Sequence, residues 1–248
     1  MKYLLLLPLL LSQLSYAQLS PEPIPSVKKL PVNYPSTWLF AHDANFYSLV
    51  TGRVIIVDVA ADTQEYKGAI SAAQFGTFVS SSVHNELYVG ESFYSRGTTG
   101  DRTDVVSIYE KETLNKIDEI ILPNNNRAQI VTNKYAFRLI NDDRFLLVFG
   151  FTPASSVIVV DTQKRKVINE IGIPGCSMIY PTAKLGFSSL CADGSLLSVT
   201  LDETGQLRSK KNVPPFFDVD KDPLFDKPVY ANNKAYFASY SGMIYPII

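Results

Sequence analysis

The sequence predicts an all-β fold, specifically a β-propeller, and three observations support this. No segment shows a helical period of apolar residues over ten positions. A β-branched run, a polar turn and a second apolar run occur together four times. The repeated run begins at residues 54, 105, 157 and 196, so successive units are 51, 52 and 39 residues long. Units of this length, each with several short strands, are typical of propeller blades.

Each unit also contains strands before the repeated run, which brings its total to about four. The expected hairpins are 54–58 with 66–70, 105–109 with 117–122, 157–161 with 167–173, and 196–200 with a weaker strand. The expected strands outside them are 75–79, 87–89, 135–140, 145–149, 178–180, 187–191 and 235–240. A β-sandwich is the alternative, but a sandwich would not require the same strand–turn–strand pattern four times in one phase.

The expected propeller domain covers residues 37–248 and contains about four and a half blades. The last unit reaches Ile248 when its third strand, near Met243, has only begun. An open propeller leaves sheet edges exposed. We therefore expect that C-terminal blades are missing from this sequence, with a small closed propeller as the alternative.

The first residues have the pattern of an export signal. Lys2 supplies a positive charge, an apolar run covers 4–11, and Ala17 ends a small-residue cleavage site. The run is too short to cross a bilayer, which takes about 20 residues. We expect a signal peptide over 1–17, an exported periplasmic chain and no membrane span. The proline-rich residues 18–36 are expected to form an extended lead-in.

Composition and motifs argue against several functions for this chain. It is 46% hydrophobic and 19% charged, with a formal net charge of −1 and no basic block, which disfavours nucleic-acid binding. The His and Cys residues lack the spacing of a zinc site, and no calcium loop is present, so no metal is expected. No nucleophilic triad or phosphate-binding loop is found, so no catalytic residue is expected on this chain.

Single polar residues near strand ends are interpreted as turn residues. His42 with Asp43 and, separately, His84 are expected in solvated turns. Asp58 and Asp161 each end a predicted strand and are expected to form the turn that follows.

The two cysteines are expected to form a disulfide. Cys176 and Cys191 are the only pair in a chain that is expected to be exported. Their bond would close a loop of about 16 residues and contribute about 3 kcal/mol on the loop-entropy model. Two buried free thiols are the alternative.

A polar insertion within a hairpin, residues 91–104, is the most unusual segment. It carries Phe93 and Tyr94 at its base and Arg96, Asp101, Arg102 and Asp104 at its tip. Aromatic residues and Arg are favoured at protein interfaces. We therefore expect partner contacts through Phe93, Tyr94, Arg96 and Arg102, with a solvated loop as the alternative.

Several stretches resemble the heavy (large) subunit of methylamine dehydrogenase. The similar stretches are FYSRGTTGDRTDVV (93–106), FTPASSVIVVD (151–161), IPGCSMIYPTA (173–183), CADGS (191–195), PVY (228–230) and YSG (240–242). The third and fourth together keep the cysteine spacing, Pro181-Thr182 and an Asp-Gly-Ser turn. The resemblance covers roughly residues 36–248 and implies a seven-bladed propeller.

The resemblance also implies a function. The family's heavy subunit pairs with a light subunit, two of each, in a periplasmic amine dehydrogenase that oxidises primary amines to aldehyde and ammonia. The cofactor, tryptophan tryptophylquinone, is made from two Trp of the light subunit, and electrons pass to a blue copper protein such as amicyanin or azurin. This chain has a single Trp, Trp38, and so cannot form that cofactor alone.

The resemblance further suggests a residue of the substrate channel. The family's heavy subunit lends an aromatic side chain four positions after an Asp of the first blade. Here Asp43 precedes Phe46 and Tyr47, so one of these two is the expected channel residue, with blade packing as the alternative. A different class of function also stays open, in which the shortened propeller is a stand-alone binding module or has no function.

Overall fold

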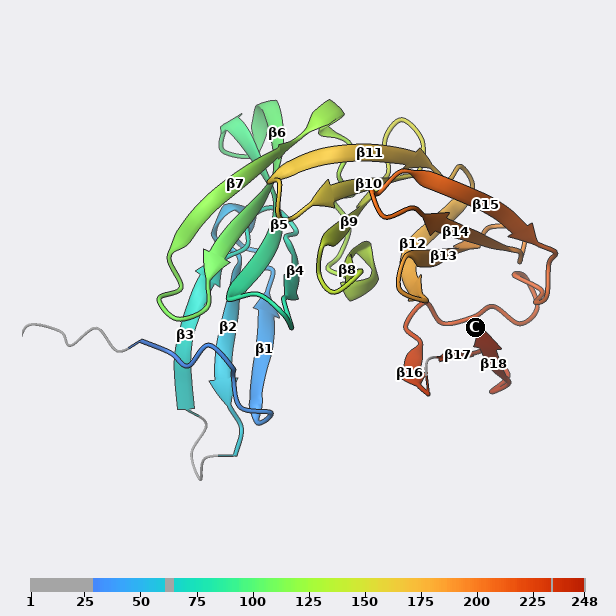
Figure 1. Cartoon of the computed structure of the whole chain (residues 1–248), viewed down its shortest axis with the longest axis horizontal. Coiled ribbons are helices and arrows are strands. Elements are labelled where there is room, and N and C mark those ends of the chain that lie inside the picture. Colours follow the sequence, from blue (N-terminus) through green and yellow to red (C-terminus); the bar gives the residue numbers. More distant parts are fainter. Residues whose placement is uncertain (1–28, 61–64, 233, 248) are drawn as a thin grey trace, which may run out of the picture.

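The computed structural model describes residues 29–60, 65–232 and 234–247. The expected signal peptide and most of the lead-in lie outside the described residues. The described chain forms five antiparallel sheets that follow one another in sequence and are arranged along an arc (Figure 1). The all-β propeller prediction is therefore confirmed, and the β-sandwich alternative is wrong. The first and fifth sheets lie apart, so the described residues do not form the small closed ring that was the other alternative.

Blades 1 to 3 contain the first eleven strands. They are β1 (Trp38–Asp43), β2 (Arg53–Asp58) and β3 (Glu65–Ser71); β4 (Thr77–Ser80), β5 (Glu86–Arg96), β6 (Thr99–Glu110) and β7 (Lys116–Leu122); and β8 (Phe137–Ile140), β9 (Phe145–Gly150), β10 (Ser156–Asp161) and β11 (Lys166–Gly172).

Blades 4 and 5 contain the remaining strands, and three 3₁₀ turns lie between strands. The strands are β12 (Cys176–Thr182), β13 (Gly186–Cys191), β14 (Leu196–Leu201) and β15 (Leu207–Val213), then β16 (Val229–Ala231), β17 (Lys234–Ala238) and β18 (Ile244–Ile247). The turns are η1 (Leu49–Thr51), η2 (Pro123–Asn125) and η3 (Lys134–Ala136).

The repeated run of the sequence is the same structural strand in four blades: β2, β6, β10 and β14. In each of these blades the pairing of this strand with the next one contains a register shift, at Ile56/Val57, Ile108/Tyr109, Val159/Val160 and Thr200/Leu201. A β-bulge increases local twist, and here it recurs at one place in the repeat. Blade 1 differs from the prediction because it has three strands, with β1 at its inner edge (Figure 1).

The core lies between neighbouring blades. Every residue of β9 and β10 is buried. Along β9, Leu146 and Val148 pack in the cluster shared with blade 2, whereas Leu147 and Phe149 pack in the cluster shared with blade 4. Both faces of the sheet are thus covered, which explains why these strands are continuous apolar runs rather than alternating ones.

The two ends of the propeller carry different segments. One end, here called the connection end, carries the links between blades together with the β1–β2, β5–β6, β9–β10, β13–β14 and β17–β18 turns. The opposite turn end carries the other hairpin turns. Hydrogen bonds join neighbours at each end: Gln74 N donates to Leu49 O at 2.7 Å at the connection end, and Asn141 N donates to Lys184 O at 3.0 Å at the turn end.

The disulfide between Cys176 and Cys191 is present, as predicted. It joins the start of β12 to the end of β13, where the two residues are opposite each other in the sheet. The cross-link therefore fixes the inner edge of blade 4 at the connection end. The predicted turn roles are also confirmed: Asp58 Oδ1 accepts from Ala60 N, and Asp161 Oδ1 accepts from two backbone amides. Among the described residues, no helix has the length and apolar character needed to cross a membrane.

Candidate functional site

Exposed aromatic side chains gather at the connection end. Large exposed Phe and Tyr residues in the segments of this end are Phe46, Tyr47, Phe93, Phe151, Phe225 and Tyr240. In the described turns of the opposite end, the large exposed apolar residues are Val59 and Val83. Apolar surface gathered on one end of a molecule marks an interaction site. The connection end is therefore the candidate functional surface.

The two candidate channel residues lie on this surface. Phe46 and Tyr47 are in the loop after β1, where Asp43 Oδ1 accepts a hydrogen bond from Asn45 N at 2.9 Å. Phe46 is 68% exposed and meets the edge of Phe75 with ring centroids 5.9 Å apart, whereas Tyr47 is fully exposed. Neither side chain is packed within a blade. Sequence reasoning could not distinguish these surroundings, because Phe75 comes from the link to the next blade.

The polar insertion 91–104 is not the solvated loop that was the alternative interpretation. It continues the β5–β6 ladder outwards as a hairpin with a tight turn at Gly97. Phe93 and Arg96 are exposed on the extension and Tyr94 is half-buried, its hydroxyl donating to Gln129 Oε1 at 2.7 Å. Phe93 and Arg96 are thus presented to solvent on a paired strand. A partner that binds them would cost less conformational entropy than one that had to order a free loop.

Asp104, expected at the tip of the insertion, lies instead at its root and is fully buried. Arg102 binds its carboxylate through two nitrogens, Nε and Nη2, each at 2.8 Å. Arg102 also donates to the carbonyl of Arg127. This predicted contact residue is therefore half-buried and already paired inside the chain.

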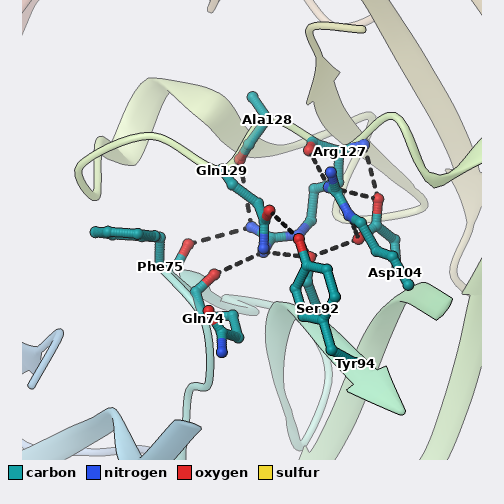
Figure 2. A network of polar contacts seen from close by, with 9 residues as sticks. Gln74, Phe75, Ser92, Tyr94, Asp104, Arg127, Ala128 and Gln129 are labelled. Atoms are coloured by element: carbon teal, nitrogen blue, oxygen red, sulfur yellow. Dashed lines mark hydrogen bonds and ion pairs between the residues drawn. The ribbon is translucent and has the colours of Figure 1, made fainter. Parts of the chain in front are cut away.

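Arg127 is the centre of this network, and sequence reasoning missed it. It lies in the link between β7 and β8 and is buried (Figure 2). Its backbone N donates to Asp104 Oδ2 at 2.9 Å, and its guanidinium donates to Ser92 Oγ at 2.8 Å. The same group reaches the preceding link, donating to Gln74 O at 2.9 Å and Phe75 O at 3.2 Å. One side chain thus joins the hairpin of blade 2 to two blade-to-blade links.

Charges in this region balance. Arg102 and Arg127 face the buried carboxylates of Asp104 and Glu91, and Glu91 accepts from Ala73 N at 2.9 Å and Ser107 Oγ. Burial lowers the pKa of Arg127 to about 10, with the charge of Asp104 acting in the opposite direction. The guanidinium therefore stays protonated at neutral pH. A buried ion network of this kind holds one geometry, because each charge would be unpaired in another.

The Arg127 network holds the segments that carry the exposed aromatic side chains. Phe75, whose carbonyl accepts from Arg127, is the residue against which Phe46 packs. Ser92, which accepts from the same guanidinium, immediately precedes Phe93. The loop with Phe46 and the hairpin with Phe93 are thus both attached to one buried side chain.

Comparison with known proteins assigns this architecture to a family. A family model described as methylamine dehydrogenase heavy chain (MADH) matches residues 37–248, which is most of the chain. The chain belongs to this family. The expected resemblance is thereby confirmed.

Similar curated proteins carry the same name. Methylamine dehydrogenase heavy chains from Methylorubrum extorquens and Methylophilus methylotrophus are 27% identical over 223 residues and 29% identical over 203 residues. These matches cover 89% and 81% of this chain but 53% and 48% of the relatives. The chain thus spans about half the length of the heavy chains it matches.

Solved structures show a similar fold. The dihydro-heme d1 dehydrogenase NirN matches with a TM-score of 0.54 at 16% identity, covering 92% of this chain and 46% of that one. BamB from Moraxella catarrhalis matches with a TM-score of 0.50 at 14% identity, covering 87% and 55%. Both are propellers, and at these identities the likeness concerns the fold alone.

The described residues of this chain hold no group of three or more His, Cys, Asp or Glu side chains that could bind a metal. Its two histidines are not in solvated turns, so that prediction is wrong. His84 is half-buried in a turn, where its backbone N donates to Ser81 Oγ at 2.7 Å. His42 lies within β1 and is half-buried, with both ring nitrogens buried and without a hydrogen-bond partner among the described residues.

His42 is expected to make stability depend on pH. Burial lowers the pKa of His42, and the charge of Asp43 offsets part of this effect. The unfolded chain then binds a proton below about pH 6.5 that the folded chain binds only at lower pH, so stability falls as pH falls through this range. The free energy of unfolding, measured in urea, should fall between about pH 7.5 and about pH 5.5. This fall should be smaller in His42→Gln than in the wild type. An equal fall in both proteins would contradict the prediction.

Proposed function

We propose that this chain is the large subunit of a periplasmic quinoprotein amine dehydrogenase and that its connection end binds the light subunit. The observation that carries the proposal is the aromatic surface at one end of a heavy-chain propeller, with Phe46, Tyr47 and Phe93 all exposed on it. Aromatic side chains held on a rigid support are favoured anchors of protein interfaces. An apolar surface of this kind also fits a substrate passage formed only when the partner covers it.

The proposed division of labour follows from the residues of this chain. Tryptophan tryptophylquinone needs two Trp, and the single Trp38 donates its ring N–H to Asp58 Oδ2 at 3.0 Å. The light subunit would carry that cofactor, which supplies the oxidation of a primary amine to aldehyde and ammonia before electrons pass to a blue copper protein such as amicyanin or azurin. The role of this chain is to position the light subunit and to shape the entrance to its site, where aromatic walls select among amine side chains.

Phe46 and Tyr47 would contribute differently to this entrance. Phe46 is fixed by its edge contact with Phe75, which in turn is held by Arg127. Tyr47 makes no such contact and is fully exposed, so a bound partner can cover it. We infer that Tyr47 lines the passage and that Phe46 supports its loop.

Co-expression with a light subunit tests the proposal. The exported chain and the light subunit of the Methylorubrum extorquens relative, each with a separate tag, should co-purify and show quinone absorbance and amine-dependent reduction of a dye. The chain alone should show neither absorbance nor activity. The complete heavy chain of that relative is the positive control. If the control assembles and this chain does not, the proposal is wrong and the alternative of a stand-alone binding module is favoured.

A further inference from the structure

We propose that the turn end of this propeller contains a binding site for a small organic carboxylate. A pocket of about 400 Å³ lies where β8, β12 and β16 approach one another and is lined by Arg138, Pro181, Thr182, Ala183, Lys184 and Tyr230. A second pocket shares Thr182, Ala183 and Lys184 with the first and adds Arg208 to the lining. Neither lining includes an Asp or Glu, although the whole chain has a net charge of −1.

The Arg138 side chain indicates that the ligand of this pocket is an anion. Its Nε is buried and has no hydrogen-bond partner, and within the described residues the Arg138 side chain forms no hydrogen bond or ion pair. The guanidinium carbon lies 5.7 Å from the centroid of the Tyr135 ring, so the head group is held in place. A fixed guanidinium with unused donors presents the fork that a carboxylate accepts in bidentate geometry.

The lack of any partner for its side chain distinguishes Arg138 from Arg102, Arg127, Arg144 and Arg165. Arg102 is paired with Asp104, the Arg127 guanidinium donates to backbone carbonyls, and Arg165 is paired with Glu86. Arg144, whose Nε is also buried without a hydrogen-bond partner, faces the carboxylate of Asp161 at 3.7 Å. Lys184 also lines the pocket, but its Nζ is paired with Asp142 Oδ2 at 2.7 Å, and this carboxylate offsets its positive charge. Arg138 has no such partner, and a buried donor without an acceptor is rare in folded proteins.

The walls favour an organic acid over a bare inorganic ion. The pocket of Arg138 is bounded by the ring of Pro181 and the aromatic ring of Tyr230, and the adjoining pocket by Leu185 and Leu201. Thr182, common to both, offers a hydroxyl. A ligand with an apolar body and a carboxylate head uses both kinds of surface. The aromatic surface lies at the opposite end, so this site is independent of the proposed light-subunit contact.

Isothermal titration of the exported chain with succinate tests the site. The buffer contains no other carboxylate, and ionic strength is matched with sodium chloride because surface charges are screened by salt. Succinate should bind saturably, and the neutral analogue succinamide should not. Absence of saturable succinate binding, or tighter binding of inorganic phosphate than of succinate, would overturn the assignment.

Variants locate the binding. Arg138→Gln should weaken succinate binding at least about tenfold, as expected when a hydrogen bond to a charged group is lost. Arg208→Gln, on the exposed outer strand β15, should weaken it about threefold because its charge is solvated. Lys221→Gln removes the same charge at the connection end and should leave the affinity unchanged. If Arg138→Gln does not fold by circular dichroism, the Arg208→Gln and Lys221→Gln pair decides; equal affinities in that pair would overturn the proposal.

Discussion

Replacing Asp104 with Asn is expected to destabilise the chain by about 3–5 kcal/mol, the cost of removing one partner from a buried ion network. The carboxylate accepts hydrogen bonds from Arg102, from Arg127 N and from Ser92, and it is fully buried. An amide in its place would direct an N–H₂ group at these donors and leave two guanidinium groups facing one remaining acid. For a chain of this size each kcal/mol lowers the melting temperature by about 2–4 °C.

Denaturant unfolding of three variants measures this effect. Asp104→Asn should show the full loss, and Arg102→Gln should also lose about 3 kcal/mol, because it leaves the fully buried Asp104 carboxylate without its guanidinium partner. Asp101→Asn is the matched control on the same hairpin. Its side chain is exposed, so its stability should stay within about 0.5 kcal/mol of the wild type. A loss below about 1 kcal/mol for Asp104→Asn would show that the network does not hold the hairpin.

This network also shows where prediction from the sequence stops. The apolar strands were predictable because β9 and β10 are buried on both faces between neighbouring blades. Strands of this kind appear in the sequence as continuous apolar runs. Asp104 gave no such signal: in Gly-Asp-Arg-Thr-Asp it has the appearance of a solvated turn. Its partner Arg127 comes from a different segment and directly follows a run of Asn residues that indicates a loop. A buried polar pair is specified by tertiary structure alone, so no periodic pattern of residues along one segment predicts it.

The histidines and the channel aromatics were unpredictable for a related reason. Whether His42 is solvated depends on what covers the face of β1 that also carries Trp38 and Phe40, and that cover comes from other segments. Whether Phe46 is packed or exposed depends on the position of Phe75 in the next link. By contrast, the disulfide was predictable, because two cysteines in a chain that the sequence predicts to be exported leave one pairing.

The rigid support and the aromatic surface together lead to a prediction about assembly. Removing exposed aromatics at the connection end should weaken the proposed complex with the light subunit while the folded chain is unaffected. Phe93 is 41% exposed and Tyr47 fully exposed, so truncating them removes little internal packing. If they are interface anchors, each truncation should cost about 2 kcal/mol or more of binding, which is about a 30-fold rise in Kd.

Surface plasmon resonance with immobilised light subunit measures this rise for Phe93→Ala and Tyr47→Ala. Tyr66→Ala is the matched control: Tyr66 is 65% exposed on β3, the outer strand of blade 1, away from the connection end. Its Kd should equal that of the wild type, and all three variants should unfold within about 0.5 kcal/mol of it. Because the anchors are held by Arg127, Asp104→Asn should weaken binding as well, through the hairpin rather than through contact. Equal binding by the two connection-end variants and Tyr66→Ala would place the light subunit elsewhere on the propeller.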